Sequence, residues 1–152
     1  MLKVGDTAPE FELESDTGEK VKLSSLRGKK VVLYFYPKDN TPGCTTEACE
    51  LRDRQPRLQR RGAVVLGVSP DSVKSHQKFK AKYDLPFPLL ADTDHSVAEA
   101  YGAWGEKKMY GKTHQGILRT TFIIDENGTV EQVFEKVKPK GHGDQVLEAV
   151  QK

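Results

Sequence analysis

An apolar run followed at once by a proline- and glycine-containing loop constrains this chain more than any other feature. Residues 31–36 are Val-Val-Leu-Tyr-Phe-Tyr, and such a run is typical of a strand that is buried on both faces. Pro37 ends the run, and the Thr41-Pro42-Gly43 turn leads into a sequence that favours a helix from about Cys44. The chain is therefore predicted to place a cysteine in the first turn of a helix, directly after a central strand.

A cysteine at such a position can be made reactive by the surrounding backbone. The unpaired N–H groups and the positive dipole end of a helix N-terminus stabilise a thiolate, which is the nucleophilic form. A helix N-terminus together with a cation lowers the pKa of a cysteine by about two units or more. The alternative is that Cys44 is only a small buried hydrophobic residue. The Thr, Pro and Gly residues close to the helix start favour the nucleophile.

Cys49 is the only other cysteine and gives a C-x4-C spacing. On an ideal helix the two Cα atoms lie about 8.7 Å apart, whereas a disulfide requires less than about 7 Å. The two thiols therefore cannot bond while the helix is intact, but they can if its first turns unwind. The spacing argues against a structural disulfide and favours a redox cycle that reshapes the helix.

The residues around Cys44 carry a family resemblance. Pro37, Thr41 and Cys44 form the P-x3-T-x2-C pattern, which is the active-site motif of peroxiredoxins. The string from Tyr36 to Cys49 resembles the Q-type, or bacterioferritin-comigratory, branch, and matches extend from G-D-x-A-P-x-F at 5–11 to R-x-T-F at 119–122. The resemblance implies an α/β, thioredoxin-like fold, reduction of hydroperoxides and no bound cofactor.

The motif implies roles for its residues. Cys44 would attack the peroxide, and the Thr41 hydroxyl could accept a hydrogen bond from the peroxide and donate one to the sulfur. Pro37 and Pro42 would shield the thiolate from water. The alternatives are turn or N-cap chemistry for the threonine and a strand stop or turn for the prolines.

Arg119 is the cation that the resemblance places beside the cysteine. It interrupts the apolar stretch 117–124, where a lone arginine would otherwise indicate an exposed strand edge. Its guanidinium can contact both sulfur and peroxide oxygen. Glu47 could hold it in a bidentate pair, although an acid in the first turn of a helix is also favoured by the helix dipole alone.

The implied cycle passes through a sulfenic acid on Cys44. Cys49 would then form an intramolecular disulfide with it, and an external dithiol such as thioredoxin would reduce that bond. A disulfide oxidoreductase on the same fold would instead require C-x2-C at the helix start, which is absent here. A redox sensor or relay that passes oxidation to a partner protein stays open as an alternative.

Length and composition set the remaining expectations. With 152 residues, the chain is predicted to form one domain over 1–152. A net charge of +2 does not favour nucleic-acid binding, and we expect neither a membrane span nor a signal peptide. Two cysteines at redox spacing favour a reducing compartment, the cytoplasm, and a local cysteine cycle favours a monomer. The four histidines have no paired spacing that would predict a metal site; they are His76, His95, His114 and His142.

The hydrophobic pattern predicts a mixed sheet with helices on both faces. We expect hairpins over 11–23 and 117–137, the second around the Asp125–Gly128 turn. We expect further strands at 31–36, 63–69 and 89–91, and helices from about Cys44 to before Gly62, from Ser72, over 96–101 and over 143–150. Pro56 should disturb the first helix. Residues 104–116 are polar and basic without periodicity, and we interpret them as an exposed loop.

Overall fold

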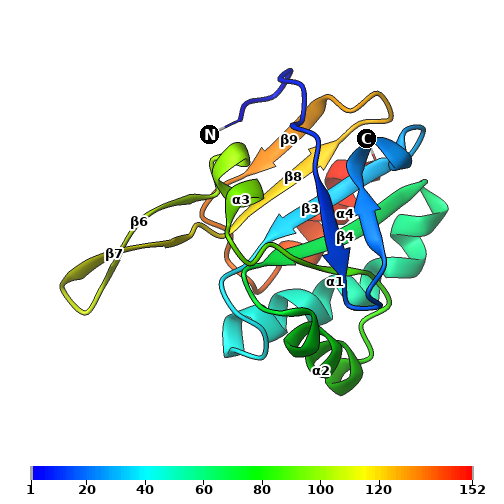
Figure 1. Cartoon of the computed structure of the whole chain (residues 1–152). Coiled ribbons are helices and arrows are strands. Elements are labelled where there is room, and N and C mark those ends of the chain that lie inside the picture. Colours follow the sequence, from blue (N-terminus) through cyan, green and yellow to red (C-terminus); the bar gives the residue numbers. More distant parts are fainter. Residues whose placement is uncertain (1, 152) are drawn as a thin grey trace.

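A mixed sheet of seven strands organises the molecule (Figure 1). The computed structural model of the chain describes residues 2–151. The strands are β1 (Glu12–Ser15), β2 (Lys20–Lys22), β3 (Lys30–Phe35), β4 (Ala63–Ser69), β5 (Leu89–Ala91), β8 (Thr120–Ile124) and β9 (Val130–Phe134). Their order across the sheet is β2-β1-β5-β4-β3-β8-β9. The β3–β4 and β4–β5 pairs are parallel and the others are antiparallel, so the mixed sheet is confirmed.

Helices cover both faces of this sheet. They are α1 (Pro42–Arg60), α2 (Val73–Tyr83), α3 (Ser96–Tyr101) and α4 (His142–Gln151), with a 3-10 turn, η1 (Leu23–Leu26), after β2. Helices α1, α2 and α4 contribute to one hydrophobic cluster and α3 to the other. The predicted N-terminal hairpin, β1–β2, joins the sheet through β5. Among residues 2–151, the helices include none with the length and apolar character needed to cross a membrane.

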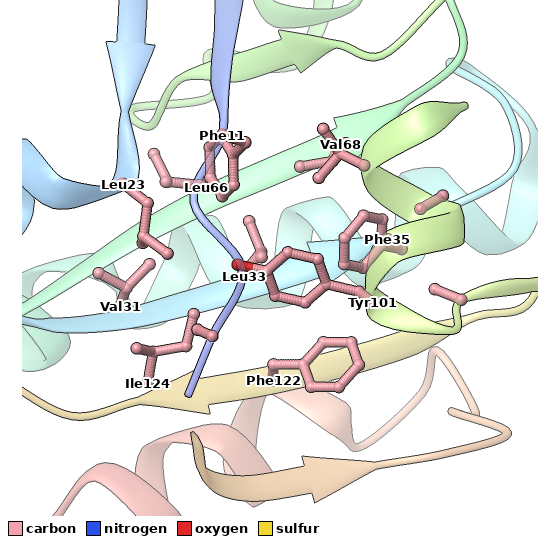
Figure 2. Packing of buried hydrophobic residues seen from close by; sticks show 14 of the residues in the cluster. Phe11, Leu23, Val31, Leu33, Phe35, Leu66, Val68, Tyr101, Phe122 and Ile124 are labelled. Atoms are coloured by element: carbon pink, nitrogen blue, oxygen red, sulfur yellow. The ribbon is translucent and has the colours of Figure 1, made fainter. Parts of the chain in front are cut away.

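Strand β3 belongs to both cores because its side chains alternate between the two faces. Val31, Leu33 and Phe35 pack into the cluster shown in Figure 2, against residues such as Phe122 and Tyr101. The alternate side chains Val32 and Tyr34, with Tyr36 directly after the strand, pack in the same cluster as side chains of α1, α2 and α4. None of these six side chains is more than 1% exposed. The end of β3 is therefore held by packing on both faces of the sheet, and the loop to α1 starts from this fixed position.

The stretch 104–116 is not the loop that the sequence suggested. It forms β6 (Trp104–Met109) and β7 (Lys112–Ile117), an antiparallel ribbon that projects from the body of the molecule (Figure 1). Tyr110 and Gly111, with φ of 53° and 76°, form the two-residue turn, a backbone geometry that suits tight hairpins. The prediction was wrong because much of the ribbon is exposed to water, which leaves no apolar alternation to detect.

Helix α1 continues through Pro56 without a break, although proline has no N–H for an internal helix hydrogen bond. Pro56 is exposed, and Leu51 and Leu58 on either side of it are buried. One further expectation was wrong. The apolar stretch 117–124 is not one strand, since β7 ends at Ile117 and β8 begins at Thr120. Arg119 lies between the two strands, where it is free of the sheet ladder and can turn toward α1.

Candidate active site

Cys44 lies in the first turn of α1, as predicted. The helix begins at Pro42, and the N-cap residue Thr41 accepts a backbone hydrogen bond of 2.8 Å from Thr45. Only 1% of Cys44 is exposed, and it belongs to the core cluster that also contains Tyr34 and Tyr36. A sulfur at this point is shielded from bulk water and lies beside the unpaired N–H groups of the helix N-terminus.

Arg119 brings positive charge to this sulfur. Its Nη2 donates to Cys44 Sγ at 3.4 Å, and its Nη1 donates to Glu47 Oε1 at 2.8 Å. The guanidinium thus bridges two groups, and the bidentate pair expected with Glu47 is not formed. Burial disfavours the charge of Arg119, but Glu47 and Cys44 outweigh it and the pKa of Arg119 is raised. The site therefore holds a fixed cation next to the cysteine sulfur.

Glu47 is the most unusual group of the site because it is fully buried. Its Oε1 accepts from Arg119, whereas its Oε2 has no hydrogen-bond partner within the described residues. Burial raises the pKa of Glu47 to about 7, even though Arg119 acts in the opposite direction. Near neutral pH the carboxyl group therefore exchanges between its charged and neutral forms, and the net charge around Cys44 changes with it.

His142, which the sequence analysis considered only as a metal ligand, lies behind Glu47. Its Nε2 is 4.0 Å from Glu47 Oε2 and 2.8 Å from Thr121 Oγ1, while its Nδ1 is 3.0 Å from Gln145 Oε1. Burial lowers the pKa of His142. The neutral ring donates from Nδ1 to Gln145 and accepts from Thr121. The part of the chain that the structure describes contains no cluster of metal-ligating side chains.

The two other motif residues, Thr41 and Pro37, lie in the loop that precedes Cys44. Thr41 Oγ1 donates to the Lys38 carbonyl at 2.9 Å. Over residues 2–151 no hydrogen bond joins Thr41 to Cys44 Sγ, so the expected donation to sulfur is not formed. Pro37 is half-buried and lines a cleft next to Arg119.

This cleft has a volume of about 310 Å³ and is mainly apolar. It is lined by Pro37, Lys107, Leu118, Arg119, Thr120, Glu135 and Lys136. Burial and the nearby Arg119 lower the pKa of Lys107, which extends from β6. The sequence alone did not predict a role for Lys107, because this residue lies in the polar and basic stretch 104–116 that we interpreted as an exposed loop. A larger cleft of about 400 Å³ lies at the other end of β4, around Ala63, away from the cysteine.

Cys49 lies on the same helix, half-buried, and both thiols are free. Because α1 is unbroken from Pro42 to Arg60, the two Cα atoms have the separation of about 8.7 Å that an ideal helix gives. This reduced state keeps the two sulfurs apart, as the sequence predicts.

Comparison with known proteins identifies the relatives of this arrangement. A model of the AhpC/TSA family matches residues 4–133. The chain is 52% identical over 150 residues to peroxiredoxin Bcp of Bacillus subtilis, covering 99% of this chain and 94% of that protein. It is 48% identical over 146 residues to peroxiredoxin Bcp of Escherichia coli K12, covering 96% and 94%.

Solved structures agree with the sequence relatives. Peroxiredoxin Q of Xanthomonas campestris superposes with a TM-score of 0.89 at 45% identity, covering 93% of this chain and 89% of that one. PrxQ of Xylella fastidiosa gives 0.93 at 38% identity, covering 99% and 96%. The predicted thioredoxin-like peroxiredoxin fold and the resemblance to the Q-type branch are both confirmed.

The buried Glu47 predicts a specific pH dependence of stability. Its pKa is about 7 in the folded chain against an ordinary 4.5, so between these values the folded state binds more protons and stability falls as pH rises. This difference corresponds to about 3 kcal/mol. We expect the free energy of unfolding, measured with urea, to fall between pH 4.5 and 8 by about this amount more in the wild type than in Glu47→Gln.

Glu148→Gln is the matched control, because Glu148 is exposed on α4. It should keep the wild-type slope. Equal slopes in the wild type and Glu47→Gln would contradict the assignment of a raised pKa to Glu47.

Proposed function

Because the chain belongs to the AhpC/TSA family of peroxiredoxins, we propose that it is a thiol-dependent peroxidase that reduces hydrogen peroxide and organic hydroperoxides to water and alcohols. The observation that carries the proposal is the contact of the Arg119 guanidinium with Cys44 Sγ at a helix N-terminus. An apolar cleft beside this contact offers space for an alkyl group. The bacterioferritin comigratory protein of Xanthomonas campestris, a structural neighbour with 44% identity, has alkyl peroxide reduction activity.

The first step is an in-line displacement. The Cys44 thiolate attacks the terminal oxygen of ROOH, the S–O bond forms as the O–O bond breaks, and the alkoxide takes a proton to become the alcohol. Negative charge moves from sulfur toward the leaving oxygen. Arg119, which contacts the sulfur from the side of the cleft, is placed to follow that charge, and a preorganised cation of this kind is an effective electrostatic catalyst.

Thr41 is proposed to orient the peroxide. Its hydroxyl proton is directed at the Lys38 carbonyl, so the lone pairs of its oxygen are left to accept from the O–H group of the peroxide. Pro37 lines the cleft and, with Pro42 at the start of α1, would limit the access of water. Glu47 holds the Arg119 guanidinium through its hydrogen bond with Nη1.

The second step forms the disulfide. Cys49 attacks the sulfur of the Cys44 sulfenic acid, the S–S bond forms and the oxygen leaves as water. A dithiol, for which we propose thioredoxin, then returns both cysteines to the reduced state. Both sulfurs come from one helix, so the cycle requires no second subunit. We propose a monomer that acts in the reducing environment of the cytoplasm.

A turnover assay with peroxide, thioredoxin and thioredoxin reductase tests the function. The wild type should consume peroxide catalytically, and Cys44→Ser should not, because a hydroxyl group is neither ionised nor comparably nucleophilic at neutral pH. Cys49→Ser should react once with peroxide and then fail to be recycled by thioredoxin. Stoichiometric oxidation of the wild type without turnover would favour the alternative of a redox sensor or relay.

Arg119 gives a second prediction. Arg119→Ala removes a charge-assisted contact that contributes about 1.5–3 kcal/mol, which slows the peroxide step roughly ten- to a hundredfold. It should also move the midpoint of the thiolate absorbance titration to higher pH, because the cation that stabilises the thiolate is lost. Arg119→Lys should recover only part of the rate, since an ammonium cannot contact Glu47 and the sulfur with a planar fork. An unchanged midpoint in Arg119→Ala would defeat the electrostatic role.

The spacing of the cysteines predicts that oxidation unwinds the start of α1. About 8.7 Å on an intact helix exceeds the disulfide limit near 7 Å, so residues 43–55 should exchange their amide hydrogens faster in the oxidised wild type. Cys49→Ser treated with peroxide should keep the slow exchange of the reduced protein. Equal protection of the reduced and disulfide forms would show that formation of the bond does not open the helix.

A further inference from the structure

The loop that carries Pro37 and Thr41 is tied to the body of the protein through one buried carboxylate, Asp39. Only 7% of Asp39 is exposed. Its Oδ1 accepts from the Tyr36 hydroxyl at 2.6 Å, and its Oδ2 lies 2.8 Å from Ser75 Oγ and 2.7 Å from His76 Nδ1. Three donors, one directly after β3 and two on α2, thus converge on the side chain of a residue that stands midway between Pro37 and Thr41 in the sequence.

The backbone of Asp39 is held as well. Its N–H donates to Asp71 Oδ2 at 2.7 Å, and Ser69 Oγ donates to the same oxygen at 3.0 Å. The next residue, Asn40, has a φ of 61°, a left-handed conformation that asparagine adopts more readily than most non-glycine residues. Its Oδ1 accepts from Lys82 Nζ at 3.3 Å and from the Tyr83 hydroxyl at 3.2 Å, so this residue is held to α2 as well.

The hydrogen bonds of His76 fix its proton count. The ring is fully buried, with Nε2 at 3.0 Å from the Leu90 carbonyl oxygen and Nδ1 at 2.7 Å from Asp39 Oδ2. A carbonyl oxygen only accepts, so Nε2 carries a hydrogen. A neutral imidazole has no second N–H for Asp39. The contact between His76 Nδ1 and Asp39 Oδ2 therefore requires a second proton, in addition to the one on Nε2.

That additional proton is best placed on His76. Asp39 already accepts from Tyr36 and Ser75, and such donors favour the charged form of a carboxylate. Tyr36, whose hydroxyl is 3.5 Å from Nδ1, is the other titratable group that contacts the ring, and burial raises its pKa well above the ordinary value. Tyr36 is thus a neutral donor, and the buried contact is an imidazolium–carboxylate pair.

We propose that His76 is a positioning residue for the peroxide step, acting through Asp39 on the loop that presents Pro37 and Thr41 to Cys44. This inference rests on the proposed peroxidase function. His76 has no hydrogen bond to the sulfur or to Arg119 in the described part of the chain, so its effect passes through the Lys38 carbonyl, which precedes Asp39 and accepts from Thr41. Losing the imidazolium leaves a buried carboxylate uncompensated, and the loop must move to hydrate it.

Lys80 offers a matched control on the same helix. Its Nζ is 2.9 Å from Oδ2 of Asp16, a buried carboxylate that also accepts from the backbone of Leu89. Lys80→Met removes the partner of Asp16 from α2, and His76→Leu removes the partner of Asp39. Only Asp39 belongs to the active-site loop. General destabilisation of α2 should therefore affect both variants, whereas a loss of loop positioning should affect only His76→Leu.

Stopped-flow measurement of Cys44 oxidation by hydrogen peroxide tests the proposal. His76→Leu should react about ten- to a hundredfold more slowly than the wild type, the loss expected for a small misplacement of reacting groups. Lys80→Met should react at close to the wild-type rate even where its Tm falls by a similar amount. His76→Asn, which can supply a neutral N–H near the position of Nδ1, should recover part of the rate.

Nitrogen-15 NMR of the wild type should show a hydrogen on both ring nitrogens of His76, as its two hydrogen-bond partners imply. A ring with one proton, or equal losses of rate in His76→Leu and Lys80→Met, would overturn the role of His76. The wild-type rate separates this result from the proposed function: peroxide that does not oxidise wild-type Cys44 overturns the peroxidase itself, whereas a normal wild-type rate with equal losses in the two variants overturns only the positioning role.

Discussion

In the proposed peroxidase the buried Cys44 sulfur carries negative charge and requires a permanent cation, and the rest of the site depends on this requirement. Only 1% of Cys44 is exposed, so water cannot stabilise its thiolate, and an unpaired buried charge is costly. Arg119 supplies the cation at 3.4 Å, and it is fixed in turn by Glu47 at 2.8 Å. Glu47 is itself buried with one oxygen unpaired. Glu47 therefore holds the Arg119 guanidinium in place, and the guanidinium in turn contacts the Cys44 sulfur.

The sheet determines where this arrangement can be assembled. Because β3 is buried on both faces, its end cannot shift, and the loop from Tyr36 to Thr41 delivers the N-terminus of α1 to a fixed position. Strand β8 pairs with β3 and begins at Thr120, opposite Phe35 at the end of β3. Arg119, the residue immediately before β8, therefore reaches the site from the neighbouring strand. Cys44 and Arg119 are 75 residues apart in the chain, yet the loop after the end of β3 and the residue before the start of the antiparallel β8 bring them together at one edge of the sheet.

The sequence was sufficient for the parts of this design that depend on local pattern. The apolar run of β3, the turn before α1 and the spacing of Cys44 and Cys49 are local features, and the motif resemblance added Arg119. The Asp39–His76 contact and the position of His142 behind Glu47 arise from packing between distant segments, which periodicity does not reveal. The β6–β7 ribbon was missed for a different reason. Much of it is exposed to water, and the sequence of an exposed hairpin resembles that of a polar loop.

The same contacts also determine which end of α1 can open. Glu50, the residue after Cys49, accepts from the backbone N–H groups of Gly141 and Gly143, each at 2.8 Å, and so holds α1 to the start of α4. At the other end, the side chain of Thr41 forms no cap hydrogen bond with the helix, and the contact between Arg119 and the sulfur is electrostatic. Conversion of the thiolate to a neutral sulfenic acid removes the charge that Arg119 was attracting. In the proposed cycle, the step that consumes the nucleophile therefore weakens the restraint on the first turn while the helix beyond Cys49 stays anchored, so opening proceeds from Pro42 toward Cys49 and brings Cys44 to its partner.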